Sequence, residues 1–141
     1  MSLKQKLAGI CRRFGVQDLY AFGSRAVEVS AMVDNRSVSF SSPGSDLDIG
    51  VLPVRLTCWE PGKKVDLAIE LEDLFEAGRV DLVFLPEVDP FLALDIIRGE
   101  LLFSSAPDRQ ARYELFVLRR AGDLLPFKKD RVKMILEQGG R

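Results

Sequence analysis

The chain has 141 residues, of which 47% are hydrophobic and 29% are charged, and its formal net charge is −1. This length corresponds to one domain, and the composition is typical of a folded globular protein, which excludes a mainly disordered chain. The sequence contains no histidine, which excludes Ser-His-Asp triads and zinc sites of the HExxH class. Any catalysis therefore depends on carboxylates, hydroxyls, Lys or Arg, a thiol or a bound metal.

Cysteine usage and hydropathy predict a cytoplasmic protein. The two cysteines, Cys11 and Cys58, do not form a disulfide framework, which favours a reducing compartment. No apolar run reaches the ~18–20 residues of a membrane span, and no apolar segment follows the basic residues near Met1 as it would in a signal peptide. We therefore expect neither a membrane association nor a secretory leader.

Charge is distributed unevenly along the chain. Residues 1–107 contain 11 Lys and Arg against 16 Asp and Glu, whereas residues 108–141 contain 9 against 5. The acidic main body predicts no direct binding to DNA and argues against broad nonspecific nucleic-acid binding. The basic C-terminal segment has two interpretations: a contact surface for an acidic partner or RNA, or a solvated helix face.

Helices and strands alternate in the predicted secondary structure of the first half. Apolar residues at helical spacing predict a helix over 3–14 that ends at Gly15, and a strand over 18–22 follows. A helix over about 24–33 is favoured over a hairpin that turns at Asp34-Asn35. The Ser-rich residues 37–45 predict a loop, and a strand over 46–52 ends at Pro53.

The second half continues the alternation. A helix is predicted over 63–77 with Gly78 after it, and an apolar strand over 80–85. Asp89 and Pro90 predict the N-cap and first turn of a helix that runs to Arg98 and stops at Gly99. A short strand over 101–103, a helix to about Ala121 and a further helical piece after Pro126 complete the chain. This order predicts an α/β fold with a mixed sheet of about four strands flanked by helices, with C-terminal helices.

Two aspartates in one predicted strand are the most unusual feature of the sequence. Asp46 and Asp48 alternate with Leu47 and Ile49, so their side chains share one strand face, about 6.6 Å apart along it. Aspartate is disfavoured in strands, and two like charges on one face repel unless a cation lies between them. Their carboxylates suit Mg²⁺, which binds carboxylates together with substrate phosphates; the alternative is two solvated side chains on an exposed face.

A third carboxylate is expected to join this pair. Asp81 lies near the start of the apolar strand over 80–85, which we expect to neighbour the strand over 46–52. Asp66 repeats the Val-Asp-Leu tripeptide in a helical context, where favourable charge in a first helical turn explains it better. We therefore choose Asp81 over Asp66.

A Gly-Ser turn provides the groups that a phosphate requires. Gly23 follows a predicted strand and lets the backbone turn and approach a ligand closely. The Ser24 hydroxyl and the N–H groups of a helix start bind phosphate oxygens, and Arg25 is available for charge. By itself this pattern is most often a turn with an N-cap.

Taken together, the segments YAFGSRA (20–26), SDLDIGV (45–51) and VDLVFL (80–85) resemble the minimal nucleotidyltransferases of the polymerase-beta superfamily. The resemblance covers residues 3–104 approximately and divides the chain into a nucleotidyltransferase domain, 1–104, and a C-terminal helical extension, 105–141, packed on the same domain. It implies that Gly23, Ser24 and Arg25 bind the nucleotide, and that Asp46, Asp48 and Asp81 are catalytic and hold two Mg²⁺ ions. ATP or another nucleoside triphosphate is the implied substrate.

The resemblance also implies a biological context. Chains of this size look like the stand-alone members that pair with a helical HEPN protein, often a ribonuclease toxin, and act as antitoxins by tight binding or by adding AMP to the toxin. A broad apolar surface in the C-terminal segment, including Leu115, Phe116 and Leu118, agrees with a partner or with a homo-oligomer, unless all of it packs within the chain.

The sequence departs from the family pattern at two points. Glu28 stands where the family usually has a second glycine, four residues after Ser24, and the gap between Ser24 and Asp46 is longer by roughly ten residues. These departures, with the segment 27–44, leave two alternatives beside an active enzyme that modifies its partner. One is a catalytically inactive antitoxin that only binds, and the other is a small-molecule nucleotidyltransferase that needs another subunit.

Overall fold

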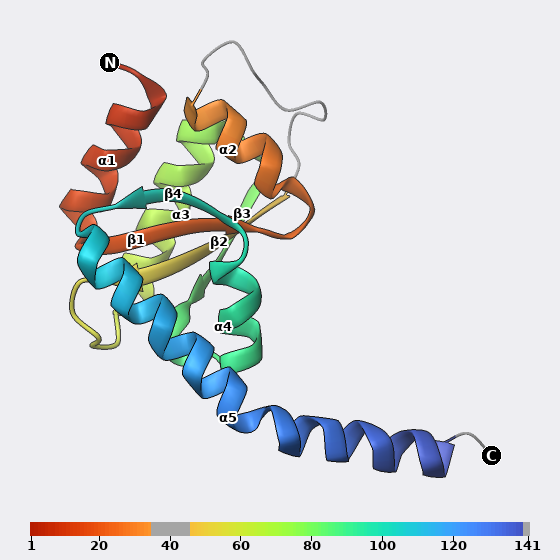
Figure 1. Ribbon diagram of the computed structural model, residues 1–141. Coiled ribbons are helices and arrows are strands. Elements are labelled where there is room, and N and C mark those ends of the chain that lie inside the picture. The colour runs from red at the N-terminus through yellow and green to blue at the C-terminus, as the bar shows by residue number, and fades with distance from the viewer. Residues whose placement is uncertain (35–45, 140–141) are drawn as a thin grey trace.

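The computed structural model describes residues 1–34 and 46–139, with side chains up to residue 126. Helices and strands alternate along this part of the chain (Figure 1). The elements are α1 (Leu3–Phe14), β1 (Val16–Phe22), η1 (Gly23–Arg25), α2 (Ala26–Asp34), β2 (Asp46–Pro53), α3 (Pro61–Phe75), β3 (Arg79–Phe84), η2 (Leu85–Glu87), α4 (Pro90–Ile97), β4 (Glu100–Ser104) and α5 (Pro107–Gly139). This alternation confirms the predicted α/β class.

The four strands form one mixed sheet in the order β3-β2-β1-β4. Strand β1 runs antiparallel to both β2 and β4, whereas β2 and β3 are parallel. The predicted four-stranded mixed sheet is therefore confirmed. Because β1 is antiparallel to β2 and β3 is parallel to it, the C-terminal end of β1 and the N-terminal ends of β2 and β3 lie at the same end of the sheet.

Helices cover both faces of the sheet. Helices α1, α2 and α3 lie on one face and α4 and α5 on the other (Figure 1), and each face has its own apolar core. Leu19, Ile49 and Leu71 are fully buried on the α1–α3 face, while Tyr20 and Ile96 are buried on the α4 face. Successive strand residues alternate between faces, so the charged residues of β2 share the α4 face.

Local capping explains where the helices begin and end. Ser2 and Gln5 form a capping box at the start of α1, and Gly15 ends that helix with a φ of 77°, as predicted. Asp89 caps α4 by accepting from the N–H groups of Phe91 and Leu92, also as predicted.

The predicted bounds of α3 are wrong by two residues at each end. The helix starts at Pro61 rather than at residue 63, because proline is well tolerated in a first turn. It ends at Phe75, and Glu76, not Gly78, takes the left-handed conformation with a φ of 53°. The Ala77 N–H then donates to the Glu72 carbonyl, which satisfies a carbonyl at the helix end.

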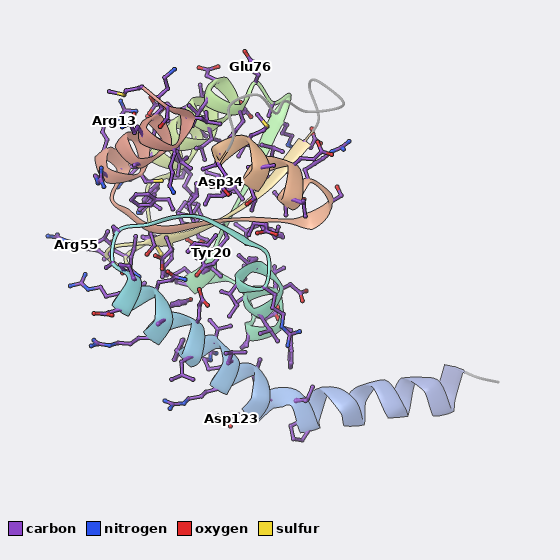
Figure 2. All side chains as sticks on the ribbon, turned by 45° about the horizontal axis from the view of Figure 1, so that its top comes forward. Arg13, Tyr20, Asp34, Arg55, Glu76 and Asp123 are labelled. Atoms are coloured by element: carbon purple, nitrogen blue, oxygen red, sulfur yellow. The ribbon has the colours of Figure 1, made fainter. Side chains whose placement is uncertain are left out.

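The C-terminal helix differs from the prediction of two helical pieces. Helix α5 is continuous and contains Pro126, which has no N–H to donate and whose ring crowds the carbonyl one turn earlier. The helix bends near Asp123 (Figure 2), and beyond the bend it extends away from the sheet and the other helices (Figure 1). Its first half packs against α4.

Two other sequence predictions concern the segment before β2. Helix α2 runs to Asp34, so the helix was the correct choice over a hairpin up to that residue. The predicted loop over 37–45, and with it most of the long segment 27–44, lies outside the described residues. In the part of the chain that the structure describes, no helix has the length and apolar character to cross a membrane.

A buried tyrosine ties α5 to the sheet. Tyr20 of β1 is 2% exposed and donates its hydroxyl to Glu114 Oε2 at 2.6 Å, and Gln110 Nε2 donates to the same oxygen at 2.8 Å. Figure 2 shows Tyr20 on the side of the sheet that faces α5. Burial, with the neighbouring Glu114, raises the pKa of the Tyr20 hydroxyl, so this side chain remains a donor throughout the physiological range.

Asp18, also on β1, is a buried charge that is expected to lower the stability of the protein at neutral pH. Burial raises the pKa of Asp18 above its ordinary value of 3.8 and the neighbouring Glu114 raises it further, while the hydrogen bond that Gln17 Nε2 donates to Asp18 Oδ2 at 3.1 Å lowers it by less than burial raises it. Because the folded state binds this proton more tightly than the unfolded state, Asp18 lowers the free energy of unfolding as pH rises from 3.8 through the raised pKa. Asp18→Asn should therefore stabilise the protein at neutral pH, because the amide carries no charge to bury.

Chemical denaturation across the acid-to-neutral range measures this effect. The gain from Asp18→Asn should shrink toward acid pH, where the wild-type carboxyl is itself protonated. Asp66→Asn is the control, since Asp66 is exposed on α3 and should change the unfolding free energy little at any pH. If Asp18→Asn is less stable than the wild-type protein at neutral pH, the ionised Asp18 carboxylate stabilises the folded state and this prediction is wrong.

Candidate active site

Gly23, directly after β1, is packed against an aspartate. Its φ is 76°, a conformation that side chains other than glycine rarely adopt. A Cβ atom at this position would lie 2.5 Å from Asp48 Oδ2. Glycine is therefore required here for two reasons: the positive φ of the backbone, and the Asp48 carboxylate that a Cβ atom would contact.

The three predicted aspartates lie on one face of the sheet. Asp46 and Asp48 are two residues apart on β2, and Asp48 pairs in register with Asp81 of β3. Paired residues of neighbouring strands direct their side chains to the same face, as do residues i and i+2 of one strand. The expected adjacency of the two strands is confirmed, and the three side chains lie at the end of the sheet where β1 leads into Gly23.

Electrostatic repulsion acts on the central aspartate. Burial raises the pKa of the Asp48 carboxyl, and the neighbouring carboxylates of Asp81 and Asp46 raise it further. Carboxylates that disfavour one another's ionisation are stabilised by a cation between them. Oxygen donors on a rigid strand suit a hard divalent ion such as Mg²⁺, so these residues fit the metal that the sequence resemblance implies.

An arginine that the sequence analysis did not consider completes the cluster. Arg79 pairs in register with Asp46, and its Nε donates to Asp81 Oδ1 at 2.8 Å. In the described residues no group of three or more acidic or cysteine side chains is gathered closely enough to hold a metal ion, and Arg79 occupies one oxygen of Asp81. The Arg-Val-Asp spacing could have revealed this pair, since residues i and i+2 of a strand share a face.

Removing the arginine is expected to strengthen binding of divalent cations. Arg79→Gln frees the Asp81 carboxylate and removes a positive charge, so the affinity for Mn²⁺ without nucleotide should rise by about threefold to tenfold. Paramagnetic resonance of free Mn²⁺ measures this directly. Arg13→Gln is the control, because Arg13 forms a similarly exposed ion pair with Glu70 on α1 and α3. Equal affinities in the two variants would show that Arg79 does not compete with a cation.

The predicted nucleotide-binding turn is exposed. Gly23 and Ser24 lie on the surface in η1, and α2 begins directly after it at Ala26. Arg25 is engaged: its Nη1 donates to Glu28 Oε1 at 3.0 Å. Glu28, four residues after Ser24, thus neutralises the arginine that was predicted to bind the nucleotide.

Comparison with known proteins shows the fold. No protein-family model matches the chain, and no curated protein matches it. Solved structures do match. A chain of a crystal structure described as a toxin-antitoxin with AMP-PNP is 18% identical, with a TM-score of 0.69 over 94% of this chain and 98% of that chain.

Two further solved structures give the same result. A chain from the toxin-antitoxin MntA-HepT is 17% identical, with a TM-score of 0.67 over 95% of this chain and 97% of that one. A chain from a tri-AMPylated Shewanella oneidensis HEPN toxin in complex with MNT antitoxin is 20% identical, with a TM-score of 0.60 over 94% and 92%. The protein therefore has the minimal nucleotidyltransferase fold, as its sequence resemblance predicted.

Proposed function

We propose that this protein is a Mg²⁺-dependent nucleotidyltransferase that transfers AMP from ATP to a hydroxyl group of a partner HEPN protein, and thereby acts as an antitoxin. The observation that carries the proposal is the register of Asp48 with Asp81. With it, three carboxylates of β2 and β3 lie on one face of the sheet, beside the Gly23 turn. The structural neighbours support it, because their crystals contain AMP-PNP in one case and an AMPylated HEPN toxin in another.

Each residue has a role in this proposal. Asp46, Asp48 and Asp81 would hold the metal ions. When bound, the ions supply positive charge for the attacking and leaving oxygens of an in-line displacement. Asp81 accepts the proton of the acceptor hydroxyl, whose oxygen bonds to the α-phosphorus while the bond to pyrophosphate breaks. Ser24 and the backbone N–H groups after Gly23 bind phosphate oxygens.

A labelling experiment tests the proposal. The purified protein is incubated with the HEPN protein encoded beside it and with ATP labelled at the α-phosphate. We expect label on the HEPN protein in the presence of Mg²⁺ and none with EDTA, and the other three nucleotides serve as competitors. Label on a small acceptor instead of the protein would indicate the small-molecule transferase, and no label with any nucleotide would contradict catalysis.

One observation favours a second function, a binding antitoxin without catalysis. Glu28 pairs with Arg25, and its Oε2 is buried without a hydrogen-bond partner among the described residues. The pair has no net charge, so Arg25 contributes little positive charge to attract phosphate oxygens at the turn proposed for the triphosphate. A protein that neutralises its partner equally well with and without Asp46 and Asp48 would be this kind of antitoxin.

A further inference from the structure

A groove of about 440 Å³ lies on the same face of the sheet as the aspartates, between η2 and the start of α4 on one side and α5 on the other. Apolar side chains form most of its lining: Leu56, Leu85, Pro86, Val88, Tyr113 and Phe116. Two of them are unusually accessible for their size, since Leu56 is 70% exposed and Phe116 is 49% exposed. Large apolar side chains gathered in an open groove are typical of a contact surface.

Two arginines lie beside the apolar side chains of the groove. Arg112 and Arg120 also line the groove, each four residues from Phe116 on α5, so the three side chains follow one stripe of the helix. The Arg120 guanidinium lies 5.5 Å from the centroid of the Phe116 ring. Neither arginine forms an ion pair with any of the residues that the structure describes. The groove is therefore apolar along its length and positive at two points one helical turn on either side of Phe116.

The groove and the candidate active site lie within the footprint of one partner. Leu85, in the groove wall, follows Asp81 of β3 by four residues, which is about 13 Å along a strand. A contact surface of ordinary size, about 800 Å² per partner, spans more than this distance.

We propose that the groove docks a segment of the partner that carries a bulky apolar side chain with a carboxylate near it on either side, and that this partner is the HEPN protein that the candidate active site modifies. The inference rests on the proposed function for the identity of the partner. Charge complementarity selects the occupant: a carboxylate of the partner pairs with Arg112 or Arg120 while the apolar side chain packs on Phe116. The groove holds the partner while the aspartates act on its hydroxyl group.

Affinity measurements on the full chain and the HEPN protein test the groove. Phe116→Ala should weaken binding at least tenfold, since a bulky aromatic at the centre of an interface carries much of its energy. Arg112→Glu with Arg120→Glu should also weaken binding at least tenfold and reduce its dependence on salt. The conservative pair Arg112→Lys with Arg120→Lys should retain most of the affinity.

Matched variants on the same helix control for folding and charge. Leu118 is 47% exposed on α5 and is not part of the groove lining, so Leu118→Ala should change affinity less than threefold. Arg109→Glu with Arg119→Glu makes the same change in net charge away from the groove and should have a similarly small effect. Thermal unfolding of every variant shows that α5 remains folded.

The outcomes separate this inference from the proposed function. If wild type binds the HEPN protein and the groove variants bind like their controls, the groove assignment is wrong and the proposed function stands. If the wild-type protein forms no complex with the HEPN protein, the partner named in the proposed function is wrong, and so is the assignment of the groove to that partner. If the protein forms a dimer by itself that Phe116→Ala dissociates, the occupant is a second copy of the chain and the assignment is overturned.

Discussion

Replacing Asp46 and Asp48 together by asparagine is expected to abolish nucleotidyl transfer and to stabilise the metal-free protein. Neither amide carries the charge needed to hold a divalent cation, so transfer should fall by at least 10³-fold. The pKa of Asp48 is raised by burial and by the negative charges of Asp81 and Asp46. Removing two of these three charges relieves the repulsion, and the melting temperature should rise by a few degrees.

Three measurements on this double variant distinguish catalysis from binding: label transfer, thermal unfolding without metal, and affinity for the HEPN protein. Binding should persist, because the proposed docking groove lies at the other end of β3. Asp66→Asn with Asp73→Asn, two exposed aspartates of α3, makes the same charge change away from the site and should leave transfer intact. Undiminished transfer by the Asp46 and Asp48 variant would exclude these carboxylates as metal ligands.

Gly23→Ala is expected to reduce transfer by at least about 10²-fold, because it displaces Asp48. The new Cβ atom would lie 2.5 Å from Asp48 Oδ2, so the carboxylate must rotate away from the strand face that it shares with Asp46 and Asp81. Misplacing a reacting group by about 1 Å is enough for a loss of this size. The left-handed backbone at residue 23 adds a cost of about 1 kcal/mol in stability.

Gly15→Ala isolates the backbone cost. Gly15 has nearly the same φ, 77° against 76°, but a Cβ atom there would meet nothing within 4 Å. Both variants should lose similar stability in chemical denaturation, and only Gly23→Ala should lose transfer and bind Mn²⁺ more weakly. If the two variants keep equal activity, the contact between Gly23 and Asp48 has no role in the reaction.

Local sequence patterns were sufficient for most of the secondary structure. Helix α1 and its end at Gly15, the Asp89 cap of α4 and all four strands follow from spacing and from residues that fix a backbone conformation. The errors occur where local preference is weak. Glu76 adopts a conformation that glycine favours, and α5 continues through Pro126, where the sequence predicted separate helical pieces.

The candidate residues and the adjacency of their two strands could be predicted from the sequence, but the register between the strands could not. Asp46 and Asp48 stand out because two like charges on one strand face repel each other unless a cation lies between them. That the two side chains share a face follows from strand geometry alone. The pairing of Asp48 with Asp81 depends on the register between two strands whose paired residues are 33 positions apart in the chain. That register is set by how the apolar faces of the two strands pack once the chain has folded.

The sequence by itself determined the alternation of helices and strands, the absence of histidine chemistry and the candidate acidic residues, since each depends on residue type and near-neighbour spacing. The strand spacing of Arg79 and Asp81 is also local, although the tertiary structure shows that the two side chains pair. The pairing of Arg79 with Asp81 depends on which way the flexible Arg79 side chain turns. The tertiary structure alone decided that Gly23 is packed against Asp48 and that Leu56 and Phe116 share one groove. The contact between Gly23 and Asp48 and the lining of the groove bring together atoms of segments that meet only after the chain has folded. The distance between Gly23 and Asp48 and the shape of the groove therefore depend on the packing of the whole domain and not on any local preference.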